Sequence, residues 1–200
     1  MTGKTHAGIS SVLYVAICSK LPGKFSYIGM FVVLLASILP DVDHPKSMVN
    51  KYILPFKNKS TKVTIYVCLA IIILWFDFLY TKELLLKSLA LCFIIIGLST
   101  HRNGLLHSLT GMILFMLMIG YTSTKYSLPP LVYPFTIGYG SHLVGDMFTN
   151  MGVPLFYPFS KKKFKFPYTY KVGSKAGRLI EEIIMILGLV YTVYALYKIL

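Results

Sequence analysis

Residues 63–80 read VTIYVCLAIIILWFDFLY, an 18-residue apolar run whose single charge, Asp77, lies close to its end. A near-continuous apolar run of this length is typical of a helix that crosses a membrane. The whole chain shares this character, because 56% of its 200 residues are hydrophobic and only 14% are charged. The run and the composition together predict an all-α integral membrane protein.

Six further apolar segments surround this run, at residues 6–20, 27–40, 84–100, 105–123, 131–149 and 179–200. Several contain only about 15 apolar residues, fewer than the ~20 that a perpendicular span needs. The first two are joined by a tight turn at residues 21–24 and could instead form a re-entrant hairpin. We therefore expect a polytopic helical bundle of six to seven helices, folded as a single domain over residues 1–200.

Histidines and carboxylates cluster in four short polar segments of this apolar chain. His6 lies near the N-terminus, residues 39–44 read LPDVDH, residues 101–108 read HRNGLLHS and residues 142–146 read HLVGD. Imidazole and carboxylate together are the ligands of Zn²⁺, Mn²⁺ or Fe sites. Ionisable groups near membrane depth are costly and usually functional. The clustering therefore predicts a metal site.

The polar segments fall on one side of the membrane if each apolar segment crosses it in turn. The same side carries 14 of the 20 lysines and arginines, mostly in the loops 46–62 and 161–178, whereas the opposite side carries five. The positive-inside rule makes the richer side cytoplasmic in the cell membrane. Because these basic residues lie in loops, we expect them to meet anionic lipid headgroups and not nucleic acid.

The spacing within the segments suggests how a metal site is built. His142 and Asp146 are four residues apart, so they project from one face of a helix. Asp41 and Asp43 follow Pro40 in a loop that a regular helix should not cross. His6 and His107, near the starts of two helices, would complete a four-helix cage. Such a cage could hold one ion or two.

The order of these segments resembles that of membrane-bound metal-dependent hydrolases, some of which are LexA-regulated inner-membrane proteins of bacteria. The resemblance covers nearly the whole chain and extends to residues 152–158, GVPLFYP, which are similar to the closing element of that family. One departure is visible: the family usually reads HRGxTHS where this chain has the longer HRNGLLHS. A more distant likeness is to bacterial zinc-dependent phospholipase C.

The resemblance implies a hydrolase with one or two divalent ions, zinc first and manganese or iron as alternatives. The ions would activate a water and bind a phosphoryl or acyl oxygen. The implied substrate is a phospholipid or lipid-linked phosphoester at the cytoplasmic leaflet. The implied metal ligands are His6, Asp41, His107, His142 and Asp146. The implied catalytic residues are Asp43 and His44, as general base or extra ligand, and Arg102, for an anionic group.

Two other functions remain open from the sequence. A non-catalytic membrane protein could use the metal site for structure or sensing, and such a site should be closed by protein ligands. A divalent-cation transporter should place its ligands near the bilayer midplane, often at broken helices. The chain offers more candidate ligands than one closed site needs, which favours catalysis. The polar segments lie toward one face, which disfavours transport.

Overall fold

The computed structural model describes residues 1–100 and 104–199, and in this part of the chain it contains eight α-helices and no β-strand. The helices are α1 (Gly3–Ile17), α2 (Tyr27–Ile38), α3 (Asn50–Ile53), α4 (Lys59–Phe76), α5 (Leu84–Leu98), α6 (Leu109–Lys125), α7 (Val132–Met147) and α8 (Lys175–Ile199). Each of the seven apolar segments overlaps one of the long helices. The predicted all-helical class is therefore confirmed.

Four short helical turns connect these elements. They are η1 (Cys18–Lys20), η2 (Pro40–Asp43), η3 (Asp77–Thr81) and η4 (Leu105–His107). The loop expected around Asp41 was wrong, because η2 continues directly from the end of α2 as a 3₁₀ turn. Pro40 ends the regular α-helix but fits the first position of a helical turn, where its missing N–H costs nothing.

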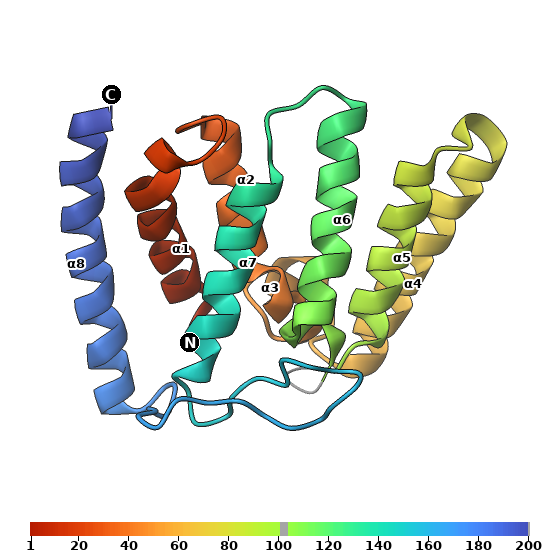
Figure 1. Cartoon of the computed structure of the whole chain (residues 1–200). Coiled ribbons are helices and arrows are strands. Elements are labelled where there is room, and N and C mark those ends of the chain that lie inside the picture. The colour runs from red at the N-terminus through yellow and green to blue at the C-terminus, as the bar shows by residue number, and fades with distance from the viewer. Residues whose placement is uncertain (101–103, 200) are drawn as a thin grey trace.

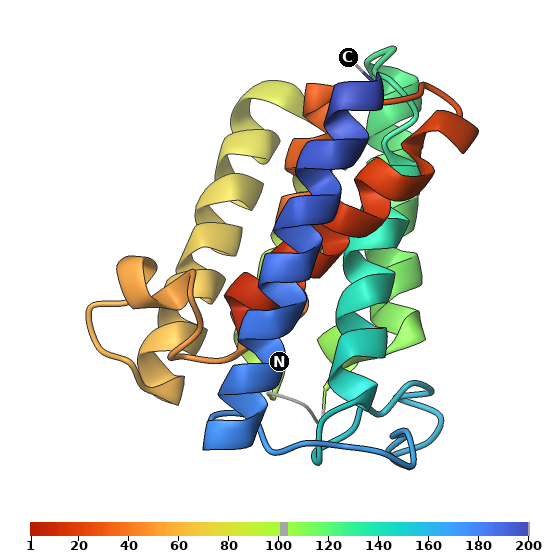
Figure 2. The same ribbon diagram turned by 90° about the vertical axis from the view of Figure 1, so that its left-hand side faces the viewer.

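The long helices stand side by side, with α8 at one edge and the α4–α5 hairpin at the other (Figure 1). Helix α7 packs against α2, α1 and α6, and α8 packs on α1. Seen from the α8 edge, α8 lies across α1 (Figure 2). The N-terminus, the start of α6, the end of α7 and residues 148–174 all lie at one end of the bundle (Figure 1). The histidine and carboxylate segments are thereby brought to that end.

Short polar side chains fix where the helices begin. Thr2, Ser26, Asn58 and Ser108 precede α1, α2, α4 and α6, and each accepts a hydrogen bond from a backbone N–H in the first turn. Such caps satisfy backbone groups that have no partner within the helix and typically contribute about 1 kcal/mol. Ser108 has a second consequence, because it places His107 just outside α6.

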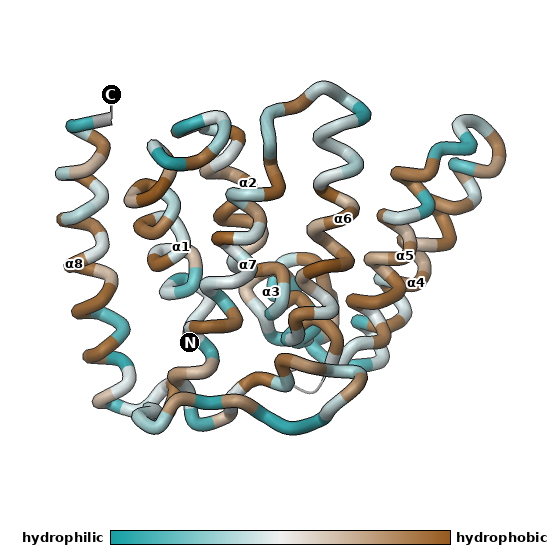
Figure 3. Tube along the Cα trace, viewed as in Figure 1, coloured by the Kyte–Doolittle hydropathy of each residue, from teal (hydrophilic) through white to brown (hydrophobic). Residues whose placement is uncertain are grey.

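Among the residues that the structure describes, two helices are long and apolar enough to cross a membrane, over Lys59–Thr81 and Lys175–Lys198. Leu84–Leu98 is a shorter apolar helix. Only 17% and 11% of the two long apolar windows are buried, and their exposed residues include Ile72, Trp75, Leu187 and Leu189. Hydrophobic residues occur along both helices (Figure 3). Exposed apolar surface of this extent suits contact with lipid. The expected six to seven spans stay a prediction.

A buried apolar cluster lies directly behind the polar segments. It joins Leu106 and Phe115 to Phe135, Tyr139 and Leu143 on α7. The Tyr139 hydroxyl donates a hydrogen bond to the Leu106 carbonyl, which anchors η4 against α7. Packing of this density positions side chains rigidly, so the neighbours of Leu106 and Leu143 in sequence, His107 and His142, are held in place.

Candidate metal centre

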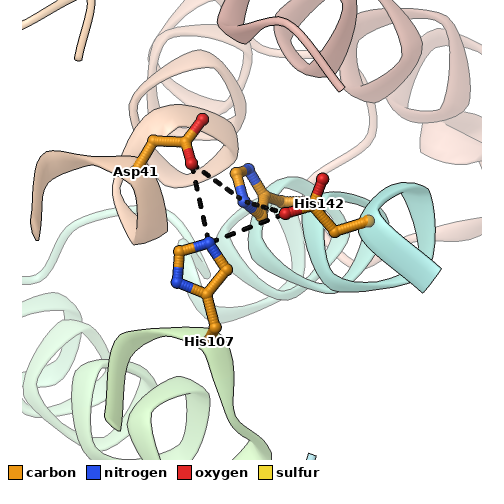
Figure 4. Close-up of side chains that lie close together, drawn as sticks. Asp41, His107 and His142 are labelled. Carbon is orange, nitrogen blue, oxygen red and sulfur yellow. Dashed lines mark ion pairs between the residues drawn. The ribbon is translucent and has the colours of Figure 1, made fainter. Parts of the chain in front are cut away.

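Four predicted ligands converge at one point, namely Asp41 on η2, His107 on η4, and His142 and Asp146 on α7 (Figure 4). One ligand atom from each lies within 4.8 Å of the other three. His107 Nε2 lies 3.5 Å from Asp41 Oδ1 and 3.6 Å from Asp146 Oδ2. His142 Nε2 lies 3.8 Å and 3.7 Å from the same two oxygens. We call these residues the four-donor cluster.

The spacing and chemistry of the four-donor cluster suit a divalent cation. Zinc–ligand bonds of about 2.0–2.2 Å place tetrahedral ligand atoms about 3.4 Å apart, close to the 3.5–3.8 Å between the histidine nitrogens and the aspartate oxygens. Two imidazole nitrogens and two carboxylate oxygens match zinc, manganese or iron. Within residues 1–100 and 104–199, His142 Nε2 has no hydrogen-bond partner although it is fully buried. Buried polar atoms are normally satisfied, and an ion would satisfy this one.

His142 is oriented by the backbone of α2. Its Nδ1 lies 2.7 Å from the Ser37 carbonyl oxygen. Only a protonated Nδ1 can donate to a carbonyl, so the other nitrogen, Nε2, presents its lone pair to the cluster. This backbone contact fixes both the tautomer and the ring orientation, as is usual for metal-binding histidines. His142 and Asp146 therefore project from one face of α7, as their four-residue spacing predicts, and α2 holds the His142 ring.

Asp41 and Asp43 contact opposite nitrogens of His107. Asp41 Oδ1 lies on the Nε2 side, whereas Asp43 Oδ2 lies 3.6 Å from Nδ1. The 3₁₀ geometry of η2 separates them, because successive residues turn by about 120° and residues two apart point in different directions. Asp43 is 1% exposed and His107 is fully buried. A carboxylate behind a histidine is the arrangement that orients a metal ligand.

The carboxylate of Asp41 is held in its charged form. Burial alone would raise the pKa of Asp41, but the hydrogen bond from His107 lowers the pKa below its ordinary value. A charged carboxylate is the form that binds a cation.

His6 lies beside the four-donor cluster and contacts the other oxygen of Asp146. Its ring stacks on His142 with the centroids 3.8 Å apart. His6 Nε2 is 3.3 Å from Asp146 Oδ1, and the Met1 amino group is 2.6 Å from the same oxygen. Asp146 thus presents one oxygen to the cluster and one to His6. This arrangement leaves His6 adjacent to the four converging atoms and not among them.

The cluster opens to a polar pocket at Asp41. The side chain of Asp41 is 19% exposed, whereas those of the other three donors are fully buried. The pocket has a volume of about 190 Å³ and is lined in part by His44, Lys46 and Ser47. His44 Nδ1 accepts a hydrogen bond from the Lys46 backbone N–H. His44 therefore lines the polar pocket together with Asp41.

Two buried polar side chains that sequence reasoning missed hold η2 in place. Lys62 Nζ donates to the carbonyl oxygens of Asp43, Ile96 and Ser99 at 2.9, 3.0 and 2.7 Å. Asn50 Nδ2 donates to the carbonyl oxygens of Val42 and His44, the residues on either side of Asp43. Lys62 was expected in a loop at the lipid headgroups, but it is 1% exposed within α4. Its only sequence signal is its place directly before the apolar run.

Arg102 and His101 lie outside the residues that the structure describes. The expected role of Arg102, in binding an anionic group, stays a prediction.

The fold and the four-donor cluster define a class: a helical membrane protein with a candidate site for a divalent cation. The family described as YdjM inner membrane protein matches residues 1–199, so the chain belongs to that family. No curated protein and no solved structure matches the chain. The expected inner-membrane character is confirmed by this membership. The likenesses to hydrolases and to phospholipase C stay predictions.

Proposed function

We propose that this protein is a metal-dependent hydrolase of the inner membrane that acts on a phospholipid or lipid-linked phosphoester at the cytoplasmic leaflet. One observation carries the proposal: the four-donor cluster meets a polar pocket at Asp41, its single partly exposed member. A structural or sensory site would be closed by protein ligands, whereas a catalytic site keeps a position open. The opening at Asp41 therefore favours catalysis.

The cluster would hold one divalent ion, with zinc the best match for its mixed nitrogen and oxygen donors. Such an ion would lower the pKa of a coordinated water and polarise a phosphoryl oxygen. The two oxygens of Asp146 face the cluster and His6 respectively, so His6 would support a second ion or orient Asp146. A cation transporter is disfavoured, because the donors include residues in the last two turns of α7, near the end of the bundle.

The residues around the ion would transfer the proton, bind the headgroup and orient a ligand. His44, which lines the polar pocket, would accept the proton of the attacking water at Nδ1, the nitrogen that in this structure accepts a hydrogen bond from the Lys46 N–H. Lys46, which lines the same pocket, would attract an anionic headgroup. Asp43, behind His107, would orient that ligand and keep its Nε2 toward the ion. Of the two groups expected to act as base, the geometry thus favours His44 for proton transfer and Asp43 for orientation.

Three substitutions in η2 and its flank test this division. His44→Ala should lower turnover by roughly 10²–10⁴-fold and retain the metal. Asp43→Asn should weaken metal affinity or activity by about 10–100-fold. Asp41→Asn should lose both metal and activity. Metal content by mass spectrometry and hydrolysis of phosphatidylglycerol by purified protein measure the two properties side by side.

The same panel contains the results that would contradict the proposal. If the metal-loaded parent hydrolyses no substrate in a broad panel of phosphoesters and lipids, the protein is not a hydrolase and the structural or sensory function becomes the better account. If His44→Ala hydrolyses as fast as the parent, proton transfer belongs to another group.

The proposal also requires six to seven spans with the metal end of the bundle in the cytoplasm. We expect that an impermeant thiol reagent added to intact cells will not label Ser60→Cys or Ser174→Cys, because both lie at the lysine-rich end. Ser127→Cys, an exposed position between α6 and α7, should be labelled. The native residues Cys18, Cys68 and Cys92 are replaced by alanine beforehand. The reverse labelling pattern would overturn the orientation and the choice of leaflet.

A further inference from the structure

An apolar cavity lies between α1, α7 and α8, on the other side of Met1 from the polar pocket. Its volume is about 550 Å³, within the range of small-molecule binding sites. The walls are almost entirely hydrocarbon, with contributions from each helix, including Ile9, Leu13, Ile137, Val144, Ile180 and Ile184. The cavity therefore suits an apolar ligand, and its shape is set by three helices of the bundle.

The cavity reaches the candidate metal centre. Met1 lines both the apolar cavity and the polar pocket that contains Asp41. Gly145, the residue before Asp146, also lines the cavity. A Cβ at Gly145 would lie 2.9 Å from Met1 Sδ and 3.2 Å from His6 Cε1. A single layer of side chains thus separates the apolar cavity from the residues around Asp146.

The polar pocket and the apolar cavity meet at Met1. Together they match the polar headgroup and the apolar chain of a lipid. The polar pocket presents Lys46 and His44 to an anionic headgroup, and the neighbouring cavity offers hydrocarbon surface to a chain. Helix α8, which forms one wall of the cavity, packs on α1 and not closely on α7. A chain of a lipid in the surrounding bilayer can therefore enter sideways while its headgroup stays at the bundle end.

We infer that this cavity binds one acyl chain of an anionic phospholipid whose phosphate headgroup occupies the polar pocket. The inference rests on the proposed function and adds where the acyl chain binds and which residues line that site. Gly140 gives a direct means of closing that site. It lines the cavity, and a Cβ built on it meets no atom within 4 Å. A large side chain at this position fills the cavity without displacing a metal ligand.

The test uses phosphatidylglycerol with a photoreactive diazirine on one acyl chain, added to the purified protein in vesicles. We expect label on the cavity walls of α1, α7 and α8. Gly140→Phe should lower this label by about tenfold, since excluding two methylene groups has an effect of that size. Gly140→Ala, which also raises the helix preference above that of glycine but leaves most of the cavity volume, should keep the label within about twofold of the parent. Ile184→Trp closes the cavity from α8 and should repeat the loss.

Metal content serves as the folding control for each variant. Unchanged cavity label in both Gly140→Phe and Ile184→Trp, or label spread evenly over the outer face of α4, would overturn the inference. Photolabelling needs no turnover, so the two proposals fail separately. Normal cavity labelling without hydrolysis refutes the hydrolase alone, and hydrolysis without cavity labelling refutes the chain site alone.

Discussion

The protein with Asp146→Asn should bind less than about a tenth of the divalent metal that the parent binds. The substitution keeps the shape of the side chain but removes the negative charge that a cation requires. Changes to residues that only support a ligand already cost about 10–100-fold in affinity, and Asp146 contributes Oδ2 to the four-donor cluster itself. His142→Ala should have a similar effect, because it removes the donor one turn away. Metal content after purification measures both.

Asp77→Asn is the matched control for this prediction. Asp77 is also a buried carboxylate, 2% exposed, but it accepts hydrogen bonds from Thr81 and Glu83 in the turn after α4. This turn lies at the opposite end of the bundle (Figure 1). Asp77→Asn should therefore retain the metal. Equal metal content in Asp146→Asn, His142→Ala and the parent would rule out this pair as ligands.

Lys62→Met should destabilise the protein by on the order of 3 kcal/mol or more. Three buried carbonyl oxygens, of Asp43, Ile96 and Ser99, lose a charged donor, and each unsatisfied group costs about 1–3 kcal/mol. Methionine has nearly the same length, so lost packing contributes little. Because the Asp43 carbonyl belongs to η2, the variant should also bind metal more weakly. The temperature of unfolding in detergent and the metal content measure the two effects.

Lys59→Met provides the comparison on the same helix. Lys59 is exposed and one turn from Lys62, so its substitution should change stability by no more than about 0.5 kcal/mol. If the two variants unfold at the same temperature, the ammonium of Lys62 does not hold η2 to α4 and α5.

The helices were predictable because the apolar runs are long and end in proline, glycine and other turn residues. The site residues were also predictable as a group, since imidazoles and carboxylates are rare in such a chain and topology brings them to one end. His142 and Asp146 needed only helical spacing. The structure adds that Asp41 and Asp43 lie at different nitrogens of His107. This difference depends on η2 being a 3₁₀ turn and not an irregular loop.

Other features of the site depend on tertiary structure that no local pattern encodes. Lys62 lies among lysines that face solvent, and only its place directly before the apolar run distinguishes it from Lys59 in the sequence. Its burial follows from three carbonyl oxygens supplied by η2 and by the end of α5. The contact that orients His142 comes from the backbone carbonyl of Ser37. Every residue has a backbone carbonyl, so the residue type at this position does not predict the contact. Backbone partners of this kind appear only once the helices are packed.

The central claim is that the four-donor cluster binds a divalent ion, and X-ray absorption at the metal edge of the purified parent tests it most directly. The account predicts a bound ion with nitrogen and oxygen ligands at about 2.0–2.2 Å and no sulfur ligand, and loss of this spectrum in Asp146→Asn. A parent protein that binds no metal, or an ion with sulfur ligands at about 2.3 Å, would contradict it.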